Sequence, residues 1–302
     1  MLHRNPTQFI RNCSFFHIFF FNALTPVNLG PQLTQVKKLL LYLLMAAGLV
    51  YCASNPYSKT NKSYKQQAKK YSKVYRQYPL KDSFPTSSQW VGTTNFNLRK
   101  PNFVIIHHTA QNSCDQTLKT FTLPRTKVSA HYVICKDGTV FHMLNDYFRA
   151  WQAGLSRWGN STDINSNSIG IELDNTGFEF FTDSQLTSLT RLLGALKTEY
   201  NIPAANFIGH GDIAPTRKND PNWRFPWKQL AEQGYGLWYD DTTGVQLPVY
   251  FDHLQALRII GYDISDTTAA ILAFKRHFEQ DTTLGLNDAD KKVLYNVAKK
   301  YR

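Results

Sequence analysis

Short apolar runs that end in polar side chains mark three strands in the middle of the chain. The segments NFVIIHHTA (102–110), SIGIEL (168–173) and NFIGH (206–210) are rich in β-forming residues. Runs of this length and composition are typical of buried strands. The segment AHYVICKDGTVFHML has two further β-rich runs on either side of an Asp-Gly pair, which predicts a hairpin.

Helical periodicity appears between these strands and again near the C-terminus. Over 182–200 leucines recur every three or four residues, and Thr182 and Gln185 fit a capping box. After residue 245 come three shorter apolar patterns of helical period, separated by turns. The sequence therefore predicts an α/β (α+β) fold, with a mixed central β-sheet flanked by helices and a small C-terminal three-helix domain.

The predicted elements divide the 302 residues into four parts. We expect an N-terminal extension with a signal-like or lipoprotein-like segment, a basic linker, a sheet-containing domain and a helical domain, over 1–52, 53–94, 95–240 and 245–302 respectively. The linker is rich in Lys, Tyr, Ser and Gln. Its pattern fits either a solvated tether or a weak amphipathic helix.

The N-terminal part carries the pattern of an export signal. Two lysines precede an apolar run over 39–51, and Cys52 and small residues follow it. The run is shorter than the roughly 20 residues of a membrane-spanning helix, which favours a signal peptide. It resembles a bacterial lipoprotein signal in which Cys52 is lipidated, although Tyr51 departs from the usual small residue. A start at Val36 and a paired-helix membrane anchor both stay open.

The net charge and the cysteines bear on the class of binding partner and on the redox environment of the protein. The chain has 34 basic and 22 acidic residues, a net charge of +12, which favours an anionic partner. We take the basic residues to be scattered, and no basic and aromatic recognition motif appears, so we expect no nucleic-acid partner. The four cysteines form no C-x-x-C pair. Whether Cys114 and Cys135 form a disulfide stays open at this point.

Five polar residues at predicted strand ends are the candidates for chemistry: His107, Glu172, His210, Lys218 and Asp220. Three of them lie in or beside one loop, GHGDIAPTRKNDP, whose prolines favour a fixed geometry. Histidine and carboxylate side chains are zinc ligands, and three of them with one open position make a hydrolytic site. A carboxylate within an apolar strand, as at Glu172, is costly unless it is paired or functional.

The blocks FVIIHHTA, SAHYVI, RAWQAG, NSIGIEL and FIGHGDIAPTRKNDP, in this order, resemble the zinc-dependent N-acetylmuramoyl-L-alanine amidases of the type 2 family. This group is related to peptidoglycan recognition proteins. Three-helix peptidoglycan-binding modules also accompany such amidases, and residues 245–302 resemble one. The resemblance covers about two-thirds of the chain.

The resemblance implies a role for each candidate residue. His107, His210 and Asp220 would bind Zn²⁺, Glu172 would be the catalytic glutamate, and Lys218 would steady the substrate carbonyl. Asp220 stands where some relatives have cysteine, and a carboxylate is an accepted ligand for zinc.

The same blocks provide candidate substrate-binding residues, namely His131, Trp151 and Asn167. For His131 a structural or wall-lining role is the stronger alternative. His108 should point to the opposite face of its strand from His107. Gln152 replaces a histidine that is frequent in relatives, and we expect it to affect one auxiliary substrate contact.

The resemblance implies a monomeric hydrolase that cleaves the amide bond between N-acetylmuramic acid and L-alanine in peptidoglycan or muropeptides. Its location would be the cell envelope, at the periplasmic face of the outer membrane as a lipoprotein. The rival is a non-catalytic peptidoglycan-recognition protein. We expect 245–302 to bind the wall and to be dispensable for chemistry. The alternative is that it closes a groove against Trp223 and Trp227.

Overall fold

The computed structural model describes residues 55–76, 95 and 97–302. The chain forms two compact units, 1–86 and 87–302, and each is described by itself.

The described part of the first unit contains one helix, α2 (Ser58–Tyr75). This helix falls in the predicted basic linker, so the helical alternative for that segment is the observed one. Of the helices among the described residues, none is long and apolar enough to cross a membrane. The apolar run 39–51 and Cys52 lie outside the described residues.

The second unit is built on a mixed sheet of five strands in the order β3-β2-β4-β1-β5. All pairs are parallel except β2 with β3, which are antiparallel. The strands are β1 (Phe103–His108), β2 (Tyr132–Ile134), β3 (Val140–His142), β4 (Ser168–Leu173) and β5 (Phe207–Gly209). The predicted mixed sheet and hairpin are confirmed.

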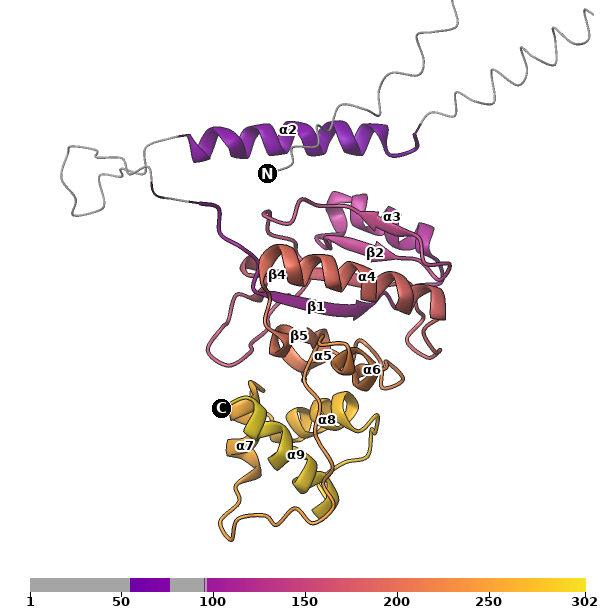
Figure 1. Ribbon diagram of the computed structural model, residues 1–302. Coiled ribbons are helices and arrows are strands. Elements are labelled where there is room, and N and C mark those ends of the chain that lie inside the picture. The colour runs from indigo at the N-terminus through magenta and orange to yellow at the C-terminus, as the bar shows by residue number, and fades with distance from the viewer. Residues whose placement is uncertain (1–54, 77–94, 96) are drawn as a thin grey trace, which may run out of the picture. The chain divides into compact units, whose positions relative to one another are not determined.

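Helices surround this sheet, as Figure 1 shows. They are α3 (Cys114–Thr122), α4 (Asp183–Tyr200), α5 (His210–Ile213), α6 (Trp227–Glu232), α7 (His253–Ile260), α8 (Thr267–Phe278) and α9 (Asp288–Lys300), with short 3-10 turns η1 (Pro124–Thr126), η2 (Ile164–Ser166) and η3 (Ala204–Asn206). The capping box predicted for α4 is present: Thr182 Oγ1 accepts the Gln185 N–H, and Gln185 Oε1 accepts the Thr182 N–H.

The two faces of the sheet bury two different cores. On one face Ile106 and Ile171 pack with Leu189 and Leu193 of α4. Side chains alternate along a strand, so Ile105 and His107 point to the other face. On that face the C-terminal helices cover the apolar part of β1, and the polar end of β1 carries His107.

The C-terminal helices share that second core with the sheet. Ile105 and Ile208 of the strands belong to the same buried cluster as Leu257 of α7 and Phe274 of α8. The three predicted helices are therefore confirmed. Because they bury a face of the sheet, their removal would expose apolar strand residues to water, and they do not have the packing of a dispensable attachment.

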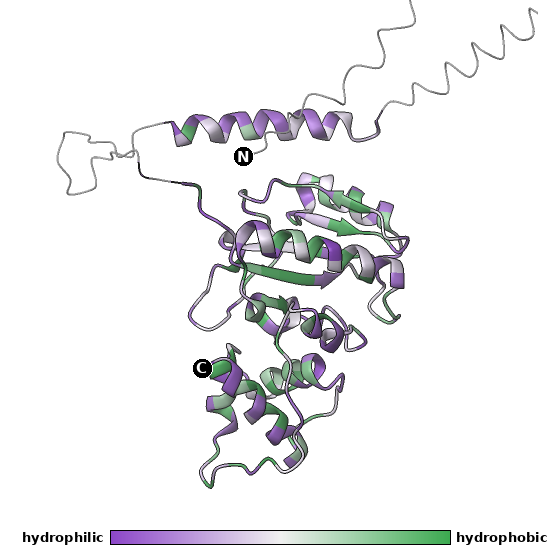
Figure 2. Cartoon of the chain, in the orientation of Figure 1, coloured by the Kyte–Doolittle hydropathy of each residue, from purple (hydrophilic) through white to green (hydrophobic). Residues whose placement is uncertain are grey.

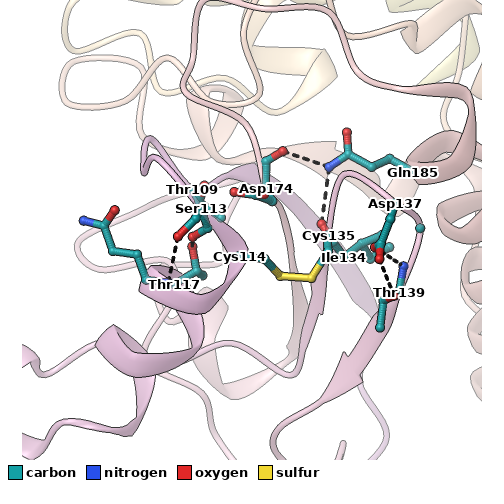
Figure 3. Close-up of a disulfide and its surroundings, with 12 residues drawn as sticks. Thr109, Ser113, Cys114, Thr117, Ile134, Cys135, Asp137, Thr139, Asp174 and Gln185 are labelled. Atoms are coloured by element: carbon teal, nitrogen blue, oxygen red, sulfur yellow. Dashed lines mark hydrogen bonds between the residues drawn. A yellow bond between two sulfur atoms is a disulfide. The ribbon is translucent and has the colours of Figure 1, made fainter.

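A disulfide joins Cys114, the first residue of α3, to Cys135, which follows β2. Figure 3 shows this bond between the helix and the hairpin. The Cα atoms are 5.4 Å apart, within the usual range for a disulfide. At the hairpin turn Asp137 Oδ1 accepts the Thr139 N–H at 2.9 Å. The pairing that the sequence left open is thus present, and it fits an oxidising compartment.

Candidate metal centre

Three buried side chains meet at the carboxyl ends of β1 and β5. His107 lies near the end of β1, and His210 is the first residue after β5. Because these strands are parallel and adjacent, their carboxyl ends share one edge of the sheet. Asp220 reaches the same place from the end of the loop, whose ends are joined by the Gly211 N–H donating to Asp220 O at 2.7 Å.

The three side chains form a tight triangle of donor atoms. His107 Nδ1 lies 3.0 Å from His210 Nδ1, and each of these nitrogens lies 3.0 Å from Asp220 Oδ2. All three residues are buried. Among the described residues this is the group of histidine, cysteine and acidic side chains that could hold a metal ion.

The hydrogen bonds of the Nε2 atoms of His107 and His210 show which ring nitrogen of each histidine carries the proton. The His107 Nε2–H donates to Gln152 Oε1 at 2.6 Å, and the His210 Nε2–H donates to the Ala153 carbonyl at 3.2 Å. Carbonyl oxygens only accept, so in each neutral ring the proton is on Nε2. Both Nδ1 atoms therefore direct unprotonated lone pairs at each other and at Asp220.

Such a triangle of lone pairs is a site for a cation. Burial raises the pKa of Asp220, whereas a proton or positive charge that His107 and His210 place against the carboxylate lowers it well below its ordinary value. With both imidazole protons on Nε2, a bound cation would supply that positive charge and keep the carboxylate ionised. Two neutral imidazole nitrogens and one anionic oxygen then converge without a proton to share, and a metal ion satisfies all three.

Gln152 is a functional residue whose role the sequence did not reveal. The Ser168 hydroxyl donates to the Ile164 carbonyl at 2.6 Å, so its oxygen accepts from Gln152 Nε2 at 2.8 Å. This fixes the amide orientation and points Gln152 Oε1 at His107. The chain also needs Gly170, because a Cβ there would lie 2.6 Å from the Gln152 side chain. Gln152 thus orients a metal ligand, as partners of metal-bound histidines usually do.

Glu172 lies beside His107 in the strand register, so both side chains are on one face of the sheet. Its Oε2 atom is buried and has no hydrogen-bond partner. Burial raises the pKa of Glu172 to about 7. A carboxyl group with a pKa near neutrality and a free oxygen beside a metal triangle is suited to accept a proton.

Lys218 is exposed on the same loop as Asp220. Burial lowers the pKa of His108, and the Lys218 charge adds to this; the same charge opposes the raised pKa of Glu172. The structure brings together His107, His210, Asp220 and Glu172, and Lys218 lies on the loop that carries Asp220. His108 points away, as expected: its Nδ1 accepts the Asn222 N–H at 3.1 Å on the far side of the strand.

The three predicted substrate-binding residues lie in different environments. Trp151 is half exposed and directly precedes Gln152, the residue that contacts His107. His131 is fully buried, its Nδ1 accepts the Gly170 N–H, and its Nε2–H donates to the Phe148 carbonyl. This favours its structural alternative.

Asn167 lies outside the centre. It precedes the first residue of β4, at the opposite end of that strand from Glu172, and its side-chain amide donates to Ser161 Oγ. Five residues of extended strand span about 16 Å. The sequence block containing both residues gave no sign that they occupy opposite edges of the sheet.

A second set of buried polar groups surrounds Asp212 in the loop 209–221, which carries the ligands His210 and Asp220 and is called the ligand loop below. Asp212, two residues after His210, accepts hydrogen bonds from the Gly209 N–H at 2.7 Å, from the Tyr262 hydroxyl at 2.9 Å and from His277 Nδ1 at 2.7 Å. The His277 ring stacks on Trp227 at 4.0 Å. The sequence pattern did not predict the contact between His277 and Asp212.

Comparisons with known proteins agree with this geometry. A family model described as N-acetylmuramoyl-L-alanine amidase matches residues 97–223. The chain is 32% identical over 222 residues to the N-acetylmuramoyl-L-alanine amidase AmiD of Escherichia coli strain K12, covering 63% of this chain and 79% of AmiD.

Two solved structures are similar over most of the second unit. AmiD from E. coli, in complex with anhydro-N-acetylmuramic acid-L-Ala-D-gamma-Glu-L-Lys, has a TM-score of 0.60 and 29% identity, covering 74% of this chain and 97% of that one. AMPDH3 from Pseudomonas aeruginosa, in complex with anhydromuramic pentapeptide, has a TM-score of 0.62 and 29% identity, covering 72% and 99%.

Proposed function

This chain belongs to the N-acetylmuramoyl-L-alanine amidase family, and on that basis we propose that His107, His210 and Asp220 hold Zn²⁺ for the hydrolysis of anhydromuropeptides. The observation that carries the proposal is the triangle of unprotonated donor atoms beside the free carboxylate oxygen of Glu172. A bare recognition module has no need of either feature. The substrate class follows from the two similar structures, each a complex with an anhydromuramic peptide.

The donor set fits zinc in particular. Imidazole nitrogens and a carboxylate oxygen are its usual ligands outside thiolate sites, and three protein ligands leave a fourth position open. A tetrahedron with bonds of about 2.0–2.1 Å has edges of about 3.3–3.4 Å. The observed separations of 3.0 Å are close to such edges.

Each residue of the centre then has a separate role in amide hydrolysis. A bound zinc ion would acidify a water molecule and polarise the amide carbonyl. Glu172 accepts a proton from the attacking water and delivers it to the departing amine nitrogen of L-alanine. Lys218 places a positive charge near the carbonyl oxygen as negative charge develops there. Water supplies the oxygen of the new carboxylate, and the carbon–nitrogen bond breaks.

We place this activity in the cell envelope, at the periplasmic face of the outer membrane. The support is the Cys114–Cys135 disulfide, which persists in oxidising compartments, together with the lipoprotein-like pattern around Cys52. The partner there would be peptidoglycan or its released muropeptides.

The proposal is tested through metal affinity. Replacing Gln152 with leucine removes the acceptor that holds the His107 proton on Nε2, so zinc affinity should fall about 10–100-fold. The measurement is competition for zinc with a chromophoric chelator, followed by the rate of peptide release from an anhydromuropeptide.

The matched control is Asn160→Leu, a change on a surface turn that touches no ligand. It should leave zinc affinity unchanged. Chelation should stop peptide release by the unaltered protein, and added zinc should restore it. Equal zinc affinity in Gln152→Leu and the control, or full activity after chelation, would contradict the proposed metal centre.

A further inference from the structure

The positive charge of the chain is concentrated in its first quarter. Residues 1–81 contain 12 basic and no acidic side chains, whereas residues 82–302 contain 22 of each. The formal charge of residues 82–302 is therefore zero, and the whole net charge of +12 precedes them. This differs from the scatter that we expected from the sequence.

Helix α2 presents half of this charge in an ordered form. Six lysines lie within its 18 residues, with no acidic residue, and Figure 2 shows the helix as predominantly hydrophilic. The lysines are Lys59, Lys62, Lys65, Lys69, Lys70 and Lys73. Within the described residues none of them has an ion pair, and all are exposed.

The helix is also two-sided. At 100° per residue, four tyrosines fall within a sector of about 40°, and the six lysines occupy about 140° on the opposite side. The tyrosines are Tyr57, Tyr64, Tyr71 and Tyr75. A helix with an aromatic stripe and a cationic face has the design of one that lies in a membrane interface, where tyrosine is enriched.

We infer that α2 binds the surface of a membrane that carries anionic phospholipid headgroups. The lysines supply attraction to the headgroups, and the tyrosine stripe supplies the contact with the interface. A helix is about 10–12 Å across, close to the Debye length of about 10 Å at 0.1 M salt, so lysines on its outer side still sense the surface charge. At 18 residues it would lie along about 27 Å of membrane.

The position of α2 in the sequence favours a membrane over nucleic acid. The helix begins six residues after Cys52, which itself follows the apolar run 39–51. A segment that is drawn to a bilayer would therefore deliver α2 to the bilayer surface. Residues 82–302 are neutral overall, so the net positive charge lies in 1–81, and α2 carries half of it.

The test uses the full chain and vesicles of phosphatidylcholine with or without 30% phosphatidylglycerol, at 0.1 M salt. We measure the ratio of the affinities for vesicles with and without phosphatidylglycerol. This gain reports the electrostatic contribution, because the apolar run 39–51 contributes to binding in both cases. Changing Lys62, Lys65, Lys69 and Lys73 to glutamine, a good helix former, should reduce this gain on the order of 100-fold. Salt at 1 M should abolish it.

The matched control changes four exposed lysines within residues 82–302, Lys119, Lys127, Lys228 and Lys299, to glutamine. It alters net charge equally and should keep the full gain. Both variants should hydrolyse a soluble anhydromuropeptide at the normal rate, which shows that each is folded. Equal losses in the two variants would overturn the inference. So would tighter binding of the unaltered chain to double-stranded DNA than to vesicles of equal phosphate concentration.

Discussion

Replacing Glu172 with alanine should lower kcat about 10²–10⁴-fold while the protein keeps its metal ion. Glu172 is adjacent to His107 but is not one of the three atoms of the triangle. Its removal therefore deletes the proton acceptor and leaves the ligands in place. Metal content by atomic spectroscopy, together with the rate of peptide release, measures the two effects separately.

The matched variant is His107→Ala, which should lose both metal and activity because it removes a ligand. A near-normal rate in Glu172→Ala would require another base. His131 is unsuitable for that role, because both of its ring nitrogens form hydrogen bonds with the backbone.

The same carboxylate should make the metal-free protein sensitive to pH. Burial raises the pKa of Glu172 from its ordinary 4.5 to about 7, so ionisation opposes folding above about pH 4.5. Glu172→Gln should therefore stabilise the chelated protein by about 1–2 kcal/mol at pH 8, since the side chain is partly exposed. The gain should fade toward pH 4.5, as chemical denaturation at the two pH values would show.

Asp212→Ala should destabilise the second unit by about 3–5 kcal/mol. The change leaves the Gly209 N–H, the Tyr262 hydroxyl and His277 buried without their acceptor. Because Asp212 is two residues from His210, the ligand loop should loosen as well, and metal affinity should fall. Urea denaturation and zinc competition measure the two effects.

Tyr262→Phe is the graded comparison, because it removes one hydrogen bond to Asp212 and should cost about 1 kcal/mol. A chain ending before residue 245 should fail to fold, because the core shared by Ile105, Ile208 and Phe274 is cut. A folded and active truncation would restore the expectation of a dispensable wall-binding module. An unchanged stability in Asp212→Ala would refute the supporting role of this network.

Local patterns were sufficient for most of the sheet, and the metal ligands were selected with the help of the family resemblance. The run FVIIHH predicted β1, the Asp-Gly turn predicted the hairpin, and Thr182 with Gln185 predicted the start of α4. These features depend on neighbouring residues. Strand-end positions gave the five candidate residues, and the family resemblance selected His107, His210 and Asp220 among them as the ligands.

Contacts between distant segments were not predictable in the same way. Gln152 differs from the common histidine, and only the positions of Ser168 and Gly170 show that its amide oxygen faces His107. The partners of Asp212 come from α8 and from the turn before it, more than 45 residues away. The helical periodicity of α8 indicated burial but not which surface it would meet.

The most direct test is hydrolysis of an anhydromuropeptide in water enriched in ¹⁸O, with products analysed by mass spectrometry. We expect a peptide that begins with a free L-alanine amine and carries no label, and a muramic acid product with one ¹⁸O in its lactyl carboxylate. Label in the peptide, or cleavage at any other bond, would contradict the proposed function.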